Sequence, residues 1–158
     1  MTKFLLSVHV LVAILAVGPI AVAASMFPRY AQQLAAPSED PGGKAAAVAE
    51  MLHRICRGYA VFGTAVPVFG FATAAQLGVL TDAWLVVSIA LTALAAAVLA
   101  MVILPQQRRV LAAAGEDAGV ATQAPPVSRL HMVTGVFNLI WAVVVVLMIV
   151  RPGSTTGA

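Results

Sequence analysis

Charged residues are scarce in this chain. Only 9% of its 158 residues are Asp, Glu, Lys or Arg, whereas about a quarter of the residues of a soluble domain are charged. Hydrophobic residues make up 61% of the chain, and its mean hydropathy is +0.99. We therefore expect most of the surface to contact a lipid bilayer, with residues 1–158 forming a single integral membrane domain.

Large basic clusters, cysteine pairs and catalytic motifs are also missing. The net charge is +3, but no Lys/Arg cluster exceeds Arg108-Arg109, so no patch can neutralise several phosphates and no nucleic-acid partner is expected. The single cysteine, Cys56, excludes an internal disulfide and a thiolate metal cluster. No motif for phosphate binding, nucleophilic catalysis or zinc binding is present. These absences favour a non-enzymatic protein, with no catalytic residue and no metal site predicted.

Long hydrophobic runs are abundant. A spanning helix needs about 20 apolar residues to cross roughly 30 Å of hydrocarbon. Four runs of this length contain no Asp, Glu, Lys or Arg, and they cover about residues 4–26, 58–80, 83–104 and 130–150. They lack the two-residue alternation of barrel strands. The sequence therefore predicts an all-α membrane protein, a bundle of four transmembrane helices.

The distribution of Lys and Arg predicts an orientation. Two cations, Lys3 and Arg151, lie on the side of the termini, and the remaining seven lie on the side of the two long loops: Arg29, Lys44, Arg54, Arg57, Arg108, Arg109 and Arg129. The positive-inside rule places both long loops in the cytoplasm and both termini outside. The many alanines and the excess of Arg over Lys suggest a bacterium, and hence its inner membrane.

The first run has a second interpretation, as a cleaved signal peptide. Lys3, the apolar stretch and Ala21-Val22-Ala23 resemble a short basic region, a hydrophobic region and a cleavage site. The run is longer than the hydrophobic region of most signal peptides, and cleavage would export the cations from Arg29 to Arg57. We therefore expect the segment to be retained as the first span.

The segment before the second span has the pattern of an amphipathic helix. Between Lys44 and Arg57, the apolar residues Val48, Met51, Leu52, Ile55 and Tyr59 form one stripe, and Glu50, His53, Arg54 and Arg57 share the other side. Glu50 and Arg54 are spaced for an ion pair. The pattern predicts a cytoplasmic or interfacial helix that continues into the span, with His53 solvated.

The connection between the third and fourth spans is predicted to be a mobile polar loop. It contains Glu116-Asp117 and Pro125-Pro126. Ser128 is well placed to cap the fourth helix.

Small residues at helical spacing predict seams at which helices pack closely. They are Gly70, Ala74 and Gly78 in the second span, and Ser88, Thr92 and Ala96 in the third. Such faces could also bind a second copy of the chain or another membrane protein. Pro19 and Pro67 are expected to kink their helices.

The fourth span places polar and small residues on one face. They are His131, Thr134, Gly135, Asn138 and Ala142. An amide at mid-membrane depth, such as Asn138, should form a hydrogen bond to another helix.

His9 is the candidate cofactor-binding residue. It lies inside the first span, and an intramembrane imidazole can serve as a ligand or a proton carrier. The alternative is a neutral histidine hydrogen-bonded to a backbone carbonyl. His131 is predicted near the opposite face, too far away to share a ligand with His9. Met148 of the fourth span is at the level of His9, and a His/Met pair would suit haem or copper.

Several short motifs carry a family resemblance. They are His9, Gly18-Pro19, Phe27-Pro28-Arg29-Tyr30, Tyr59 to Gly70 with Pro67, Ala83-Trp84-Leu85, Pro105-Gln106-Gln107-Arg108, Asn138 and the ending from Met148 to Gly153. With these motifs the chain resembles the bacterial integral membrane proteins of the domain of unknown function family 2269. That family is similar in layout to the copper-resistance D proteins and the J-type membrane protoporphyrinogen oxidases.

The resemblance implies a possible haem b site. In the oxidases a first-helix histidine is associated with haem b, and His9 followed by Arg29-Tyr30 matches that pattern. The oxidase pattern also has a lysine in its third helix, whereas residues 83–104 contain none. The function predicted is a non-enzymatic helical unit; the alternatives are a haem b- or copper-binding redox protein using His9, and a small transporter or channel subunit.

Overall fold

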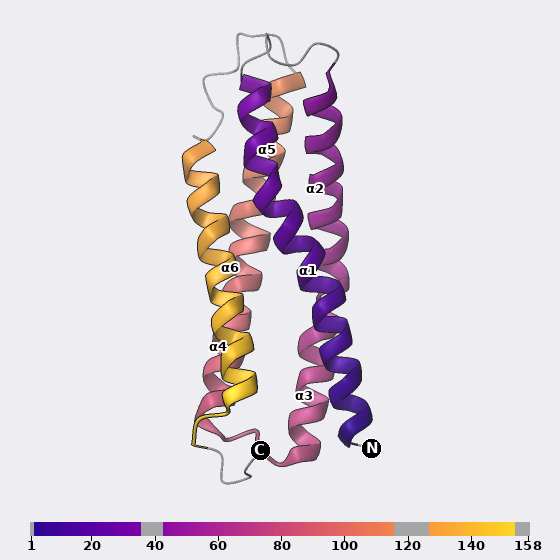
Figure 1. The fold of residues 1–158 in the computed structure, drawn as a ribbon, viewed down its shortest axis with the longest axis vertical. Coiled ribbons are helices and arrows are strands. Elements are labelled where there is room, and N and C mark those ends of the chain that lie inside the picture. The colour runs from indigo at the N-terminus through magenta and orange to yellow at the C-terminus, as the bar shows by residue number, and fades with distance from the viewer. Residues whose placement is uncertain (1, 36–42, 116–126, 154–158) are drawn as a thin grey trace.

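The computed structural model describes residues 2–35, 43–115 and 127–153, and the regular elements it gives in these ranges are all helical (Figure 1). The elements in chain order are α1 (Thr2–Ala35), α2 (Lys44–Phe62), α3 (Ala65–Leu77), α4 (Ala83–Val98), the π-helical segment η2 (Leu99–Ile103), α5 (Leu104–Gly115) and α6 (Val127–Val150). Figure 1 shows them running side by side along one axis. The start of α1, the end of α6 and the turn between α3 and α4 lie at one end of the bundle.

Within the described part of the chain, four helices are long and apolar enough to cross a bilayer. Their ranges are Thr2–Leu34, Lys44–Leu77, Ala83–Ala114 and Val127–Val150. Many large apolar side chains on the outside of the bundle are exposed, including Phe4, Phe71, Met101 and Ile149. Contact of these side chains with lipid costs no free energy, whereas their exposure to water would be unfavourable. The predicted all-α membrane fold with four spanning helices is therefore confirmed.

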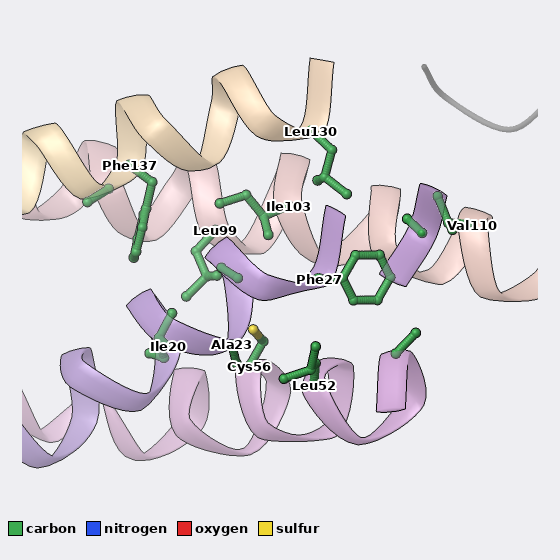
Figure 2. Close-up of a cluster of buried hydrophobic side chains, with 14 residues drawn as sticks. Ile20, Ala23, Phe27, Leu52, Cys56, Leu99, Ile103, Val110, Leu130 and Phe137 are labelled. Atoms are coloured by element: carbon green, nitrogen blue, oxygen red, sulfur yellow. The ribbon is translucent and has the colours of Figure 1, made fainter. Parts of the chain in front are cut away.

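The core of the bundle combines side chains from all four long helices. Phe27 of α1, Ile103 of η2 and Phe137 of α6 are almost completely buried, and α2 contributes Leu52 and Cys56 (Figure 2). α1 lies against α2, α3, α5 and α6. The first apolar run is thus an integral part of the packing.

Two of the predicted helix ends are wrong. The helix predicted to stop at Leu104 continues through η2 into α5 as far as Gly115, so Arg108 and Arg109 lie on a helix. Ser128 does not cap the last helix, because α6 already begins at Val127. The predicted loop residues Glu116-Asp117 and Pro125-Pro126 lie outside the described residues.

Pro67 interrupts its helix one turn earlier than its own position. A proline has no N–H to donate to the carbonyl four residues before it, and its ring crowds that carbonyl. That carbonyl belongs to Gly63, and the helix breaks at Gly63-Thr64, between α2 and α3. The Gly63 carbonyl accepts a hydrogen bond from the Val66 N–H instead, at 3.0 Å. By contrast, α1 is continuous across Pro19 and Pro28.

The packing seams are only partly as predicted. Ser88 is completely buried and Ala74 packs against Trp84 and Leu85, but Ala96 is exposed. Gly78 belongs to no seam: it ends α3 with a φ of 69°, a left-handed conformation that glycine adopts without strain.

α2 is amphipathic, and the Glu50–Arg54 ion pair is confirmed at 2.7 Å. Its buried face follows the apolar stripe only in part. Leu52 is buried and Val48 and Ile55 pack against the core. Met51 is 58% exposed. The buried residues of α2 are Ala45, Ala49, Leu52, His53 and Cys56.

Candidate functional site

His9 joins α1 to α3 near the end of the bundle that carries the termini. Its ring is half-buried, and Nδ1 lies 3.0 Å from the carbonyl oxygen of Val66. The ring lies directly over Gly70, where a built Cβ would be only 2.9 Å from its Cε1. The absence of a side chain at Gly70 is therefore what allows the imidazole to pack against α3.

The bond to Val66 determines which ring nitrogen carries hydrogen. A carbonyl oxygen can only accept, so Nδ1 must be the donor. In the neutral imidazole this leaves Nε2 with its lone pair. A metal-binding histidine usually has this arrangement, in which one nitrogen is oriented by a backbone carbonyl and the other is the ligand.

The other residues considered with His9 are Met148 and His131, and no contact of either with its ring is found among the described residues. Met148 is half-buried and packs against the cluster formed by Ala74, Trp84 and Leu85. His131 is exposed in the first turns of α6. Within the described ranges, no three His, Cys, Asp or Glu side chains come together as a metal-binding group.

A second polar cluster, which we call the His53 cluster, lies inside the bundle between α2 and α5. It consists of His53, Cys56 and Gln107. Nδ1 of His53 is 2.9 Å from Oε1 of Gln107, and Nε2 of Gln107 donates to Sγ of Cys56 at 3.7 Å. Gln107 and Cys56 are completely buried, and His53 is 7% exposed. The cluster links two helices at the level where apolar side chains form the rest of the core.

The prediction that His53 is solvated is therefore wrong. Ala49, Leu52, His53 and Cys56 are spaced as one face of a helix, and this face points into the bundle. In a membrane protein the more apolar face of a helix can turn to lipid while small and polar residues pack inside. The apolar stripe of α2 therefore identified the buried side only in part, through Leu52 and the partly buried Val48 and Ile55.

The π-helical segment explains how Gln107 reaches the cluster. The N–H of Leu104 bonds to the carbonyl of Leu99, five residues earlier. Pro105 follows directly and cannot donate a backbone hydrogen bond. The wider turn changes the rotation of the helix, and after it both Gln106 and Gln107 are buried. The sequence analysis did not identify these two glutamines as buried. The signal available for this was their position directly after Pro105, at the end of an apolar run.

The polar face of α6 is linked to α1 by a side-chain hydrogen bond. Nδ2 of Asn138 donates to Oγ of Ser25 at 2.9 Å, which confirms the predicted bond between helices. Thr134 is buried, and His131, Gly135 and Ala142 are exposed. Three buried polar atoms on this side of α6 have no partner among the described residues: Thr134 Oγ1, Asn138 Oδ1 and Trp141 Nε1.

A further polar contact lies at the terminal end of the bundle. Nε1 of Trp84 donates to Oδ2 of Asp82 at 3.0 Å, and the guanidinium of Arg151 is 5.7 Å from the Trp84 ring centroid. A cation over the face of an indole is attracted to it. This arrangement ties the end of α6 to the start of α4.

None of the protein-family models, curated proteins or solved structures compared with this chain matches it.

Proposed function

We propose that the chain is a multi-pass protein of the bacterial inner membrane that acts as a non-enzymatic helical unit. The observation that supports this most directly is that polar side chains connect helices of the bundle. The buried His53 cluster and the Asn138–Ser25 bond each join two helices. Polar groups used in this way fix how helices pack.

A partner of this unit would have to meet its exposed faces. Several of the small residues considered for association are used inside the bundle, such as Ser88 and Gly70. On α6, Gly135 and Ala142 are exposed, and an added Cβ at Gly135 would meet nothing within 4 Å. Association with another membrane helix, or with a second copy, would use this face of α6.

The second candidate is a haem b- or copper-binding protein that uses His9. Its support is the orientation of His9, because the bond from Nδ1 to Val66 directs Nε2 to serve as a ligand. The resemblance of the chain's motifs to the domain of unknown function family 2269 also favours this candidate. A bound haem would supply one-electron chemistry. The role of this chain would be to hold the iron through His9 and to orient its ring through Val66.

Spectroscopy of purified protein distinguishes the two candidates. The full chain and the His9→Ala variant are purified in detergent from cells supplied with haem precursor and copper. A Soret band or bound copper that disappears in His9→Ala would establish the second candidate. Colourless, metal-free protein with a cooperative thermal transition would support the first. His131→Ala is the matched control, because this histidine is exposed and far along the bundle.

A further inference from the structure

The indole of Trp84 contacts both an acidic and a basic side chain at the end of the bundle where α1 begins. Nε1 of Trp84 donates to Oδ2 of Asp82 at 3.0 Å, and the guanidinium carbon of Arg151 lies over the ring, 5.7 Å from its centroid. The only ion pair found among the described residues is Glu50–Arg54, so Asp82 and Arg151 do not pair with each other. Asp82 precedes α4 and Arg151 follows α6 (Figure 1). The ring, which is only 5% exposed, therefore carries a cation on its face and a carboxylate at its edge.

Asp82 is placed to cap α4, but its carboxylate has another use. It is the residue directly before the helix, where an Asp side chain commonly accepts a hydrogen bond from a backbone N–H. The Asp82 carboxylate makes no such bond and is turned to the indole instead. Its Oδ1 has no hydrogen-bond partner among the described residues. One carboxylate oxygen beside the ring is therefore available to an N–H donor of a cationic ligand.

Arg151 occupies the ring face in a strained backbone conformation. Its φ is 45°, and no other residue except glycine has a positive φ in the described part of the chain. A Cβ crowds the following carbonyl in this conformation, which is why glycine is preferred after a helix end. The other bond of the side chain is long, at 3.3 Å from Nε to the carbonyl oxygen of Met148. Because release of the side chain would let the backbone relax, another cation could displace Arg151 from the ring.

Water reaches the residues on both sides of this contact. Thr81 and Ala83 flank Asp82 in the turn before α4, and both are exposed. Pro152 and Gly153, which follow Arg151, are exposed as well. A soluble ligand can therefore approach the ring from the end of the bundle once Arg151 moves aside.

We propose that Trp84 and Asp82 form a binding site for a small guanidinium or ammonium ligand, and that Arg151 occupies this site in the absence of the ligand. The guanidinium seated on the ring identifies the ligand chemistry, because a cation is attracted to the face of an indole. The Asp82 carboxylate adds negative potential at the same place. A ligand with N–H groups would also donate to Oδ1 of Asp82. The inference depends neither on the proposed helical unit nor on His9.

Tryptophan fluorescence of the full chain in detergent tests the proposal. The chain has two tryptophans, Trp84 and Trp141, so Trp141→Phe leaves Trp84 as the only reporter. Butylguanidinium is the probe, and butylurea is its neutral counterpart of similar shape. Butylguanidinium should change the Trp84 emission with a saturable dependence on concentration, whereas butylurea should not.

Removal of the internal occupant should strengthen binding of the probe. A contact between a cation and a partly exposed aromatic ring contributes about 1 kcal/mol, which corresponds to roughly 5-fold in affinity. Arg151→Gln should therefore lower the Kd by roughly 5-fold, and Arg151→Lys, which restores a cation, should not. Arg151→Gly also removes the guanidinium and suits the positive φ. It should lower the Kd in the same way, and it serves as the test if Arg151→Gln does not fold.

Asp82→Asn tests the carboxylate. Asparagine keeps an oxygen that can accept the N–H of Trp84, but it carries no charge. In the Arg151→Gln background Asp82→Asn should raise the Kd by roughly 10-fold, because hydrogen bonds to charged groups are stronger than those to neutral ones. Lys3→Gln is the control for net charge. It removes an exposed cation of α1 at the same end of the bundle and should leave the Kd unchanged.

Four results would overturn the proposal. The first is a Kd that stays the same or rises in both Arg151→Gln and Arg151→Gly, which would make Arg151 a structural contact between α6 and α4 alone. The second is equal binding of butylurea, which would indicate an apolar crevice. The third is an Asp82→Asn protein that binds normally, or a Lys3→Gln protein whose Kd falls as in Arg151→Gln. The fourth is the absence of a saturable change in every variant.

Discussion

At the scale of single residues, histidine and glycine act together in the contact between α1 and α3. The ring of His9 reaches the Val66 carbonyl only because Gly70 leaves room beneath it. A hydrogen bond in a lipid-facing bundle replaces no bond to water, but without it the N–H of the His9 ring would be left without a partner. The pair is thus a packing contact and a polar contact at once.

Gly70→Ala should destabilise the protein by displacing His9 from Val66. The loss of one intramolecular hydrogen bond lowers the free energy of unfolding by about 0.5–1.5 kcal/mol. The measurement is the midpoint temperature of thermal unfolding in detergent, which should fall. Gly18→Ala is the control, because an added Cβ there meets nothing within 4 Å. In a His9→Ala background the Gly70→Ala change should have almost no effect, since the two residues act through one contact. Additive effects would contradict this account.

Gln107→Met should be more damaging than its similar volume suggests. It removes the only acceptor shown for Nδ1 of His53 within the described residues, and a buried donor without a partner costs about 1–3 kcal/mol. His53→Leu/Gln107→Met should recover part of that loss, because the unsatisfied group is then gone. Unfolding in detergent measures both effects. Gln76→Met changes an exposed position of α3 and should leave the stability unchanged. If the double variant is destabilised by the sum of the two single effects, His53 and Gln107 are not coupled.

Predictions for single residues were confirmed where both partners lie on one helix, or where a polar side chain within the membrane requires a hydrogen-bond partner. Glu50 and Arg54 are four residues apart on one helix, so their pairing follows from the helix itself. Asn138 has no water at its depth and needed a partner on another helix, although Ser25 could not be named in advance. His53 was misplaced because a helical pattern shows which residues share a face, not which face turns inward.

At the scale of elements, two prolines alter their helices in different ways. Pro67 breaks the helix at Gly63-Thr64, whereas Pro105 follows a π-helical turn and the helix continues. From sequence, both are a proline near a span boundary. The difference depends on what lies opposite, because after the turn before Pro105 the side chain of Gln107 forms hydrogen bonds to His53 and Cys56 of α2. The predicted end at Leu104 failed for this reason.

Deleting Met101 should be tolerated, although it shortens a transmembrane helix. Met101 lies in the wide turn and is 70% exposed. Removing one residue from a π turn converts it to an ordinary α-helical turn and preserves the register on both sides. The buried thiol of Cys56 should therefore remain protected from a maleimide in detergent.

Deleting Leu94 is the comparison for that experiment. Leu94 is 50% exposed and lies in the regular helix α4, so its loss should rotate the following residues by about 100°. Gln107 would then leave the His53 cluster, and Cys56 should react readily. Equal protection of Cys56 in both deletions would show that the π turn does not set the register.

At the scale of the whole molecule, the chain is a bundle whose two ends differ in charge. The number of spanning helices and their approximate positions could be predicted because each long apolar run has to satisfy its own backbone in lipid. The pairing of helices could not, since apolar surfaces do not specify neighbours. Contacts such as His53–Gln107 and Asn138–Ser25 supply that information.

Cysteine labelling should reveal the proposed orientation. In a Cys56→Ser background, Thr81→Cys lies in the exposed turn between α3 and α4, and Ala46→Cys lies in the exposed first turn of α2. The end of the bundle at which α2 begins carries most of the cations, so we propose that this end faces the cytoplasm. A membrane-impermeant maleimide added to cells with a permeabilised outer membrane should label Thr81→Cys only. Labelling of Ala46→Cys alone would reverse the orientation, and lysed cells provide the control for reactivity.

The length of the helices has a consequence for the membrane around them. α1 has 34 residues, or about 51 Å at 1.5 Å per residue, whereas the hydrocarbon layer is roughly 30 Å thick. Its apolar surface continues well past the level at which α2 becomes charged. The charged residues of α2 prevent the hydrocarbon boundary from following α1 to its end, because hydrocarbon around them would be costly. The lipid around the bundle should therefore adapt locally, extending further along the outer surface of α1 than along α2.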